Sequence, residues 1–382
     1  MISCQRHLFD IPDDVAYFNC AYMSPLMNSA IEAGTSGLAR KAQPWRITSD
    51  QFFSGAEEFR ELASQFFECT ADCMAIVPSA SYGISAAARN LPLKKGQRVL
   101  VLAEQFPSHY YAWQRLADEN DVALKVVPWP HDRDWTAAVL RELTPEVAIA
   151  ALPHVQWTSG GRLDLVRIGE ACRKIDAALV LDLTQSLGVL PFSVREVQPD
   201  FAVAACYKWM LAPYSIGALY VSPKWHGGKP LEENWIQRAN SRDFSSLTLY
   251  SEEYDSGARR FDMGERANFA LLPAAVRAMK QILEWKIEQI SETIGALNRK
   301  VASAAAELGF ASPPENLRGP HYLCLRSEKG IPRAVSEVLA REKIFVSLRG
   351  SSIRVAPHLY NSAADVERLI SSLKQINKEA NK

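Results

Sequence analysis

Short apolar, β-branched runs alternate along the chain with longer stretches in which apolar residues recur at helical spacing. Several short runs are apolar at successive positions, which is typical of parallel strands covered on both faces. The predicted strands are Arg98–Ala103, Leu124–Val127, Val147–Leu152, Ala178–Leu183, Phe201–Ala205 and Gly217–Val221, with a helix-length stretch at Leu163–Ile175. This βαβ order predicts a doubly wound α/β fold with a mainly parallel sheet.

The pattern changes at Pro273, after which apolar residues recur at steps of three or four as far as Val301. This spacing predicts a long amphipathic helix or a pair of helices, with Pro273 in the first turn and Gly309 as a stop. The tail predicts strands at 321–326 and 352–355 and a last helix at 363–376. A chain of 382 residues exceeds one typical domain. We therefore predict a large domain at 26–289 and a small α+β domain at 290–382.

Composition narrows the possible partners and location. Lys and Arg number 43, as do Asp and Glu, so the formal charge is zero, which argues against a nucleic-acid or anionic-membrane partner. No run approaches the roughly 18 apolar residues of a membrane span, and the first residues lack the apolar core of a signal peptide. Seven scattered cysteines indicate free thiols in a reducing cytosol. No His or second Cys pair lies near Cys69 and Cys73, so no metal site is expected.

The most informative chemistry lies in AACYKWMLAPYSIG, residues 204–217, where Lys208 follows a predicted buried strand. Burying an ammonium group is unfavourable, so a lysine there is either held as a Schiff base or extends its amine from the strand end to water. This stretch alone favours neither interpretation.

Asp182 ends another predicted strand, 26 residues before Lys208. Side chains at the carboxyl ends of such strands face the crevice where α/β sheets bind ligands. There Asp182 could keep a pyridine nitrogen protonated, and Gln185 could donate to a ring oxygen. The alternative is that Asp182 only caps the following helix.

Two further stretches carry weaker signals. In PSASYGISAA, residues 78–87, Ser79 and Ser81 open a predicted helix, which suits either phosphate binding or ordinary capping. In EQFPSHYYAW, residues 104–113, Phe106 could stack on a flat ligand or belong to the core. His109 could be a catalytic base, although such a histidine is more often polar surface.

Taken in chain order, these signals resemble the fold-type I pyridoxal-phosphate (PLP) enzymes of the class V aminotransferase family. That family includes cysteine desulfurases, kynureninases and isopenicillin N epimerase-like proteins. The resemblance runs from YFNCAYMSPL at 17–26 to SSIRVAPHLYNSAADVERL at 351–369. It implies a seven-stranded-type sheet, a cytoplasmic homodimer, and residues 1–25 joined to the small domain.

The resemblance also assigns roles by position. Lys208 is similar to the Schiff-base lysine, Asp182 to the pyridinium partner and Gln185 to the residue facing the ring oxygen O3′. For the rest of the cofactor, it implies Phe106 as the stacking residue, with Ala80, Ser81 and Tyr207 at the phosphate. For the substrate, it implies Arg354 at the α-carboxylate, with Trp157 and Ala21 nearby. Specificity is further expected from Tyr22 and from the loops near Trp235 and Arg349.

Several positions depart from the family pattern. Ala205 replaces a serine that often contacts the phosphate, and Trp157 replaces a common asparagine. The VSLRGSS loop before Arg354 lacks the catalytic cysteine of desulfurases, and Cys324 is expected to be a packed thiol. In RFDMGERANF, residues 260–269, Glu265 stands where the family has a threonine that reaches the neighbouring subunit's phosphate. Asn268 or a backbone N–H is the expected substitute.

We therefore expect a PLP-dependent enzyme acting at the Cα of a small amino acid, most simply an aminotransferase. The alternatives are a β-lyase acting on cysteine-like or kynurenine-like substrates, an epimerase, a PLP-fold protein without enzymatic activity, and a doubly wound protein for another nucleotide.

Overall fold

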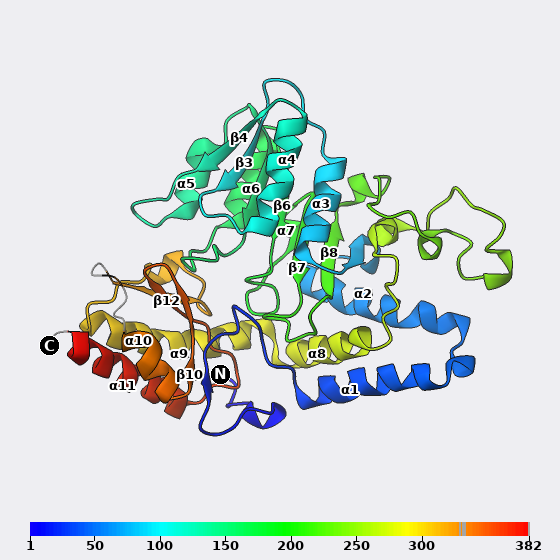
Figure 1. The fold of residues 1–382 in the computed structure, drawn as a ribbon. Coiled ribbons are helices and arrows are strands. Elements are labelled where there is room, and N and C mark those ends of the chain that lie inside the picture. The colour runs from blue at the N-terminus through cyan, green and yellow to red at the C-terminus, as the bar shows by residue number, and fades with distance from the viewer. Residues whose placement is uncertain (328–329, 331–333, 381–382) are drawn as a thin grey trace.

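The computed structural model describes residues 1–327, 330 and 334–380. The strands of its main sheet are β2 (Met74–Val77), β3 (Arg98–Leu102), β4 (Ala123–Val127), β5 (Val147–Pro153), β6 (Ala178–Asp182), β7 (Phe201–Ala205) and β8 (Gly217–Val221). Within the described residues this sheet has seven strands in the order β2-β8-β7-β6-β5-β3-β4 (Figure 1). All pairs from β7 to β4 are parallel, and β8 is antiparallel to both neighbours. The predicted mainly parallel sheet is confirmed, with β2 as an additional strand.

Both faces of this sheet are covered, as its continuously apolar strands predict. Along β6, Val180 belongs to one core cluster with Ile84 and Trp113, whereas Leu179 and Leu181 belong to the cluster on the opposite face. The first face packs against α3 (Ala80–Asn90) and α4 (Tyr111–Glu119). The second cluster contains side chains of α2 (Ser54–Phe67), α6 (Leu165–Lys174) and α8 (Leu271–Trp285). The shorter helices nearby are α1 (Asn28–Ala39), which packs on α8, α5 (Trp135–Glu142) and α7 (Val194–Val197).

The predicted long helical region is a pair of helices, α8 and α9 (Ile287–Glu307). The chain breaks between them at Lys286, whose φ of 65° lies in the left-handed region. Pro273 lies in the first turn of α8, where its missing N–H leaves no helical hydrogen bond unmade. Gly309, with φ of 82°, follows the end of α9 and supports its prediction as the stop.

A second core lies in the C-terminal part of the chain. There β9 (Leu323–Arg326), β11 (Ser347–Arg349) and β12 (Ser352–Val355) form an antiparallel sheet beside α10 (Ala334–Arg341) and α11 (Ala363–Ala380). The N-terminal segment runs beside β10 (Ile344–Phe345) in Figure 1. It joins this part of the chain because β1 (Ala16–Tyr17) pairs in parallel with β10 and Phe18 belongs to the same core. These contacts support the predicted association of residues 1–25 with the small domain, whose boundaries stay a prediction.

Candidate active site

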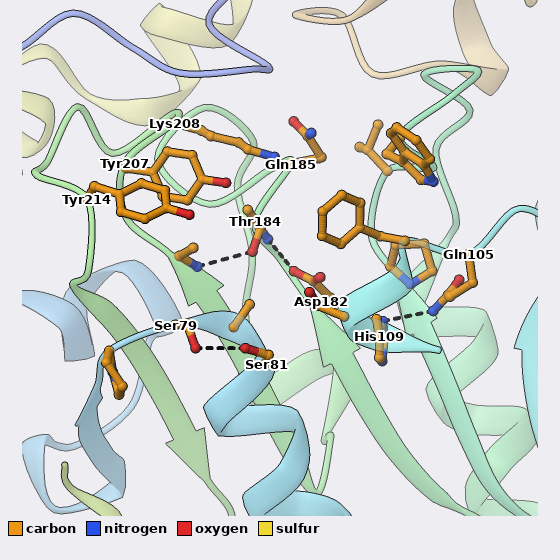
Figure 2. Close-up of a pocket in the computed structure, with 18 of the residues that line it drawn as sticks. Ser79, Ser81, Gln105, His109, Asp182, Thr184, Gln185, Tyr207, Lys208 and Tyr214 are labelled. Atoms are coloured by element: carbon orange, nitrogen blue, oxygen red, sulfur yellow. Dashed lines mark hydrogen bonds between the residues drawn. The ribbon is translucent and has the colours of Figure 1, made fainter. Parts of the chain in front are cut away.

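A cavity of about 400 Å³ opens at the carboxyl ends of the parallel strands (Figure 2). Its volume falls within the range of about 300–1,000 Å³ that is usual for small-molecule sites. Residues following β6 and β7, the start of α3 and the segment after β3 line it together. All seven predicted cofactor-binding residues are among them: Ala80, Ser81, Phe106, Asp182, Gln185, Tyr207 and Lys208. The topology therefore brings the whole predicted cofactor set to one site.

Lys208 lies three residues beyond the end of β7, with only 6% of its surface exposed. Its Nζ atom lies 5.7 Å from the centroid of the Phe106 ring and 5.6 Å from that of Tyr207. Within the described residues, Nζ has no carboxylate within 4.0 Å. Burial lowers the pKa of this amine from 10.5 to about 8, and the positive charge of Arg354 acts in the same direction, against the opposing charge of Asp182. Most of the lysine is therefore buried and the residue lines the cavity, which disfavours the interpretation as a strand-end lysine at the outer surface.

Asp182 is the last residue of β6, and 9% of its surface is exposed. Its Oδ1 accepts a hydrogen bond from the Thr184 N–H at 2.9 Å, and Thr184 Oγ1 accepts one from the Ala205 N–H at 3.1 Å. These bonds tie the ends of β6 and β7 together below the lysine (Figure 2). No side chain in the described chain forms an ion pair with Asp182. Asp182 therefore lines the cavity and also accepts a hydrogen bond from the following turn.

The side-chain amide of Gln185 is buried and makes two hydrogen bonds, one with a donor and one with an acceptor. The indole N–H of Trp209 donates to its Oε1 at 3.0 Å, and its Nε2 donates to the carbonyl of Ala21 at 3.1 Å. Trp209 Nε1 can only donate and a carbonyl can only accept, so these partners fix which end of the amide is the nitrogen. Gln185 also lines the cavity. Ala21, predicted beside the substrate, does not line the cavity and contacts it through Gln185.

The N-terminus of α3 forms the opposite end of the cavity in Figure 2. Ser79 is the N-cap residue, and its Oγ accepts from the Tyr82 N–H at 3.1 Å and lies 2.8 Å from Ser81 Oγ. A Cβ at Gly83 would lie 2.7 Å from Val203 Cγ2, so the glycine allows this helix to approach β7 closely. Free N–H groups and two hydroxyls at a helix N-terminus suit a phosphate group.

Aromatic and histidine side chains line the wall after β3. Phe106 packs edge-on against Trp157, with ring centroids 5.4 Å apart. His109 is 1% exposed, its Nδ1 lies 2.8 Å from Gln105 Nε2, and burial lowers its pKa to about 4. The interpretation of His109 as polar surface is therefore wrong, and the ring is neutral at physiological pH. Gln105 and His109 lie in a polar segment after an apolar strand, so the sequence alone does not indicate that they are buried.

Arg354 lies in β12 and does not line this cavity. It is 2% exposed, and its Nη1 donates to the Trp157 carbonyl at 3.2 Å. Its guanidinium lies 5.9 Å from the Trp157 ring and 5.8 Å from the Tyr322 ring. Its Nε is buried without a hydrogen-bond partner, and no described carboxylate lies within 4.0 Å of it. A buried, unpaired cation beside the cavity wall is a strong candidate for binding an anion.

Two other predictions concern the region around Gly264. Glu265 and Asn268 line a separate surface cavity with Trp235, away from Lys208 within one chain. Asn268 Oδ1 accepts from the N–H groups of Ala270 and Leu271 and so supports the start of α8.

Among the residues that the structure describes, no cluster of three His, Cys, Asp or Glu side chains could hold a metal, and no helix is long and apolar enough to cross a membrane.

The cavity fits PLP, since it offers an unpaired buried amine, a carboxylate, an aromatic shelf and a phosphate-sized helix terminus. Comparison with known proteins defines the class: the family model described as aminotransferase class-V matches residues 41–369, and the chain belongs to that family. The chain is therefore a PLP-dependent enzyme, and the predicted family, cofactor and enzyme class are confirmed.

The relatives within this family differ in activity. The chain is 25% identical to an uncharacterized aminotransferase, YcbU, of Bacillus subtilis, over 91% of this chain and 90% of that protein. It is 24% identical to a kynureninase of Shouchella clausii, over 93% and 84%. In fold it is similar to the apo cysteine desulfurase of Thermococcus onnurineus, with a TM-score of 0.82, 17% identity and 99% of both chains covered. The cystine C-S lyase C-DES matches with a TM-score of 0.81 and 19% identity over 94% and 96%.

Proposed function

We propose that Lys208 holds PLP in this cavity and that the enzyme acts at the Cα of a small amino acid, most simply as an aminotransferase. The observation that carries the proposal is that Lys208 is buried, has no ion-pair partner in the described chain, and shares one cavity with Asp182. A lysine of lowered pKa is a better nucleophile at neutral pH than an exposed one.

Bound PLP supplies a ring that stabilises the negative charge developed at the substrate Cα. Asp182 keeps the ring nitrogen protonated, because its carboxylate faces the cavity without a competing cation. Gln185 donates its remaining N–H to the ring oxygen. Phe106 stacks on the ring, and Ser81, Tyr207 and the N–H of Ala80 bind the phosphate.

Lys208 also moves the proton at Cα. With its amine free, Lys208 would accept that proton and return it at another atom. A pKa of about 8 suits this role, because an acid–base group works best when its pKa lies near the working pH. Arg354 binds the substrate α-carboxylate, which supplies the anion that its buried guanidinium lacks.

The β-lyase and epimerase reactions would use the same cofactor-binding and proton-moving residues, and they remain alternatives. One observation weighs against a persulfide mechanism. Cys324 lies in β9, and its buried thiol donates to the Thr158 carbonyl at 3.1 Å. Burial raises the pKa of this thiol to about 12, so it is a poor nucleophile. The VSLRGSS loop before Arg354, residues 346–352, contains no cysteine.

Product analysis with amino donors and 2-oxo acid acceptors tests the reaction type. An aminotransferase forms a 2-oxo acid and an aminated acceptor in equal amounts. Release of sulfide from cysteine, or of alanine from kynurenine, would replace this proposal with a lyase. Inversion at Cα without either product would identify an epimerase.

We also propose that the enzyme is a cytoplasmic homodimer, with a large domain at 26–289 and a small domain at 290–382. The free state of all seven cysteines supports a reducing compartment. Leu38 and Trp235 are exposed around the cavity near Gly264, which is the edge expected to face a second subunit. Sedimentation of a PLP-loaded, active monomer would contradict the dimer.

A further inference from the structure

A second cavity, of about 260 Å³, lies next to the segment that contains Trp157. The large domain contributes the loops after β4 and β5, and the small domain contributes β9 and the β11–β12 hairpin. Trp157 lines both cavities. Because the volume lies below that of a typical whole-ligand pocket, it suits one portion of a molecule that begins elsewhere.

Arg354 lines neither cavity, but it lies beside residues that line the second one. In the sheet register it is paired with Cys324 of β9, which lines the second cavity, and Ser352 two residues earlier lines it too. The Arg354 guanidinium also packs near the ring of Trp157, the residue shared by both cavities. An amino acid whose carboxylate binds Arg354 would therefore lie beside Cys324 and Ser352, which line the second cavity.

The charged side chains of this cavity are mostly positive. Arg133, Arg326 and Arg349 line it, against one carboxylate, Glu104. None of these four forms an ion pair within the described residues. Glu104 instead accepts a hydrogen bond from Thr158 Oγ1 at 2.8 Å. The positive charge of Arg349 also contributes to lowering the pKa of Lys208, so it acts on the first cavity as well. An anionic group is the natural complement to this surplus of guanidinium groups.

Indole rings form the apolar walls. Trp129 and Trp135 pack edge-on with centroids 5.2 Å apart, and both line the cavity with Trp157. The guanidinium of Arg326 lies 5.6 Å from the centroid of Trp129, so a cation is held directly above an apolar surface. Such a lining favours a chain of methylene or ring carbons that ends in a negative charge.

We propose that this second cavity binds the side chain of the amino-acid substrate, and that it selects side chains with an apolar stem and an anionic end. The proposal rests on the function proposed above, because it takes Arg354 as the site of the α-carboxylate. It extends that function by naming the substrate class.

L-glutamate and L-glutamine provide the test, since they have the same length and differ in the end charge. Each is titrated into the PLP-loaded protein, and half-saturation is read from the change in visible absorbance. The α-carboxylate is common to both, so Arg354 affects them equally. We expect glutamate to half-saturate at a concentration at least tenfold lower than glutamine. The ratio should fall several-fold in Arg349→Gln and Arg326→Gln, mainly by weakening glutamate.

Arg299→Gln is the matched control, because Arg299 pairs with Glu315 on the surface of α9. It should leave the ratio unchanged. If glutamine binds as tightly as glutamate, or if the Arg349 and Arg326 variants weaken both equally, the side-chain subsite is wrong while the proposed function survives. If no amino acid alters the absorbance of the loaded protein, the proposed function fails, and the subsite fails with it.

Discussion

The indole N–H of Trp209 donates a hydrogen bond to Oε1 of Gln185 at 3.0 Å, from the position next to Lys208. This bond fixes the side-chain amide with its nitrogen toward the Ala21 carbonyl. Trp209 is therefore a positioning residue, which acts on the site through Gln185.

Trp209→Phe should lower the free energy of unfolding by more than the loss of packing alone. The substitution leaves Oε1 of Gln185 buried without a donor, which costs about 1–3 kcal/mol. Trp113→Phe is the matched control, because Trp113 is also fully buried but its Nε1 has no described hydrogen-bond partner. Denaturant unfolding of both apoproteins measures the difference. Equal destabilisation of the two variants would show that the Trp209 hydrogen bond contributes nothing.

Lys208→Met should stabilise the apoprotein at pH 7 by about 3 kcal/mol, since the wild type buries an ammonium whose pKa falls from 10.5 to about 8. Between these two pH values the unfolded chain binds more protons at this group than the folded chain. The stability of the wild type therefore rises through that range relative to the variant, and the difference disappears above about pH 10.5. Lys95→Met, at an exposed lysine, should have little effect at any pH. A Lys208→Met difference that does not vary with pH would contradict the buried-amine account.

Ser81→Ala should weaken PLP binding about tenfold, because it removes a hydroxyl donor to a charged phosphate. Ser81 is the cleaner position, since Ser79 also caps α3. Pyridoxal, which lacks the phosphate, serves as the comparison ligand and should bind both proteins equally. Dissociation constants from absorbance titration of the apoprotein give both values. A parallel loss for pyridoxal would place the phosphate elsewhere.

Arg354→Gln should raise the half-saturating concentration of amino-acid substrate by roughly 10- to 150-fold, the range expected for losing a hydrogen-bonded charge. The amount of PLP bound should not change, because Arg354 does not line the Lys208 cavity. Amines that lack the carboxylate should be affected little. A variant that loses PLP and amine binding together would instead make Arg354 a structural residue.

The sequence predicted the sheet well because its strands are continuous apolar runs. Phe201–Ala205 and Gly217–Val221 have the predicted boundaries. The strand Met74–Val77 is not predicted, because it has only four residues and lies directly before the start of a predicted helix. Asp182 and Lys208 could be predicted from the sequence because the first ends an apolar strand and the second closely follows one. The roles of Trp209, Gln105 and His109 could not be predicted, since they depend on contacts between loops that only the folded chain brings together.

Borohydride reduction of the PLP-loaded protein, followed by peptide mass spectrometry, tests the central claim most directly. Reduction fixes the cofactor covalently to the amine that holds it. We predict that the added mass lies on Lys208 alone, and that Lys208→Ala neither shows the visible absorbance nor gains the label. Labelling of another lysine, or an unlabelled protein that still binds PLP, would contradict the account.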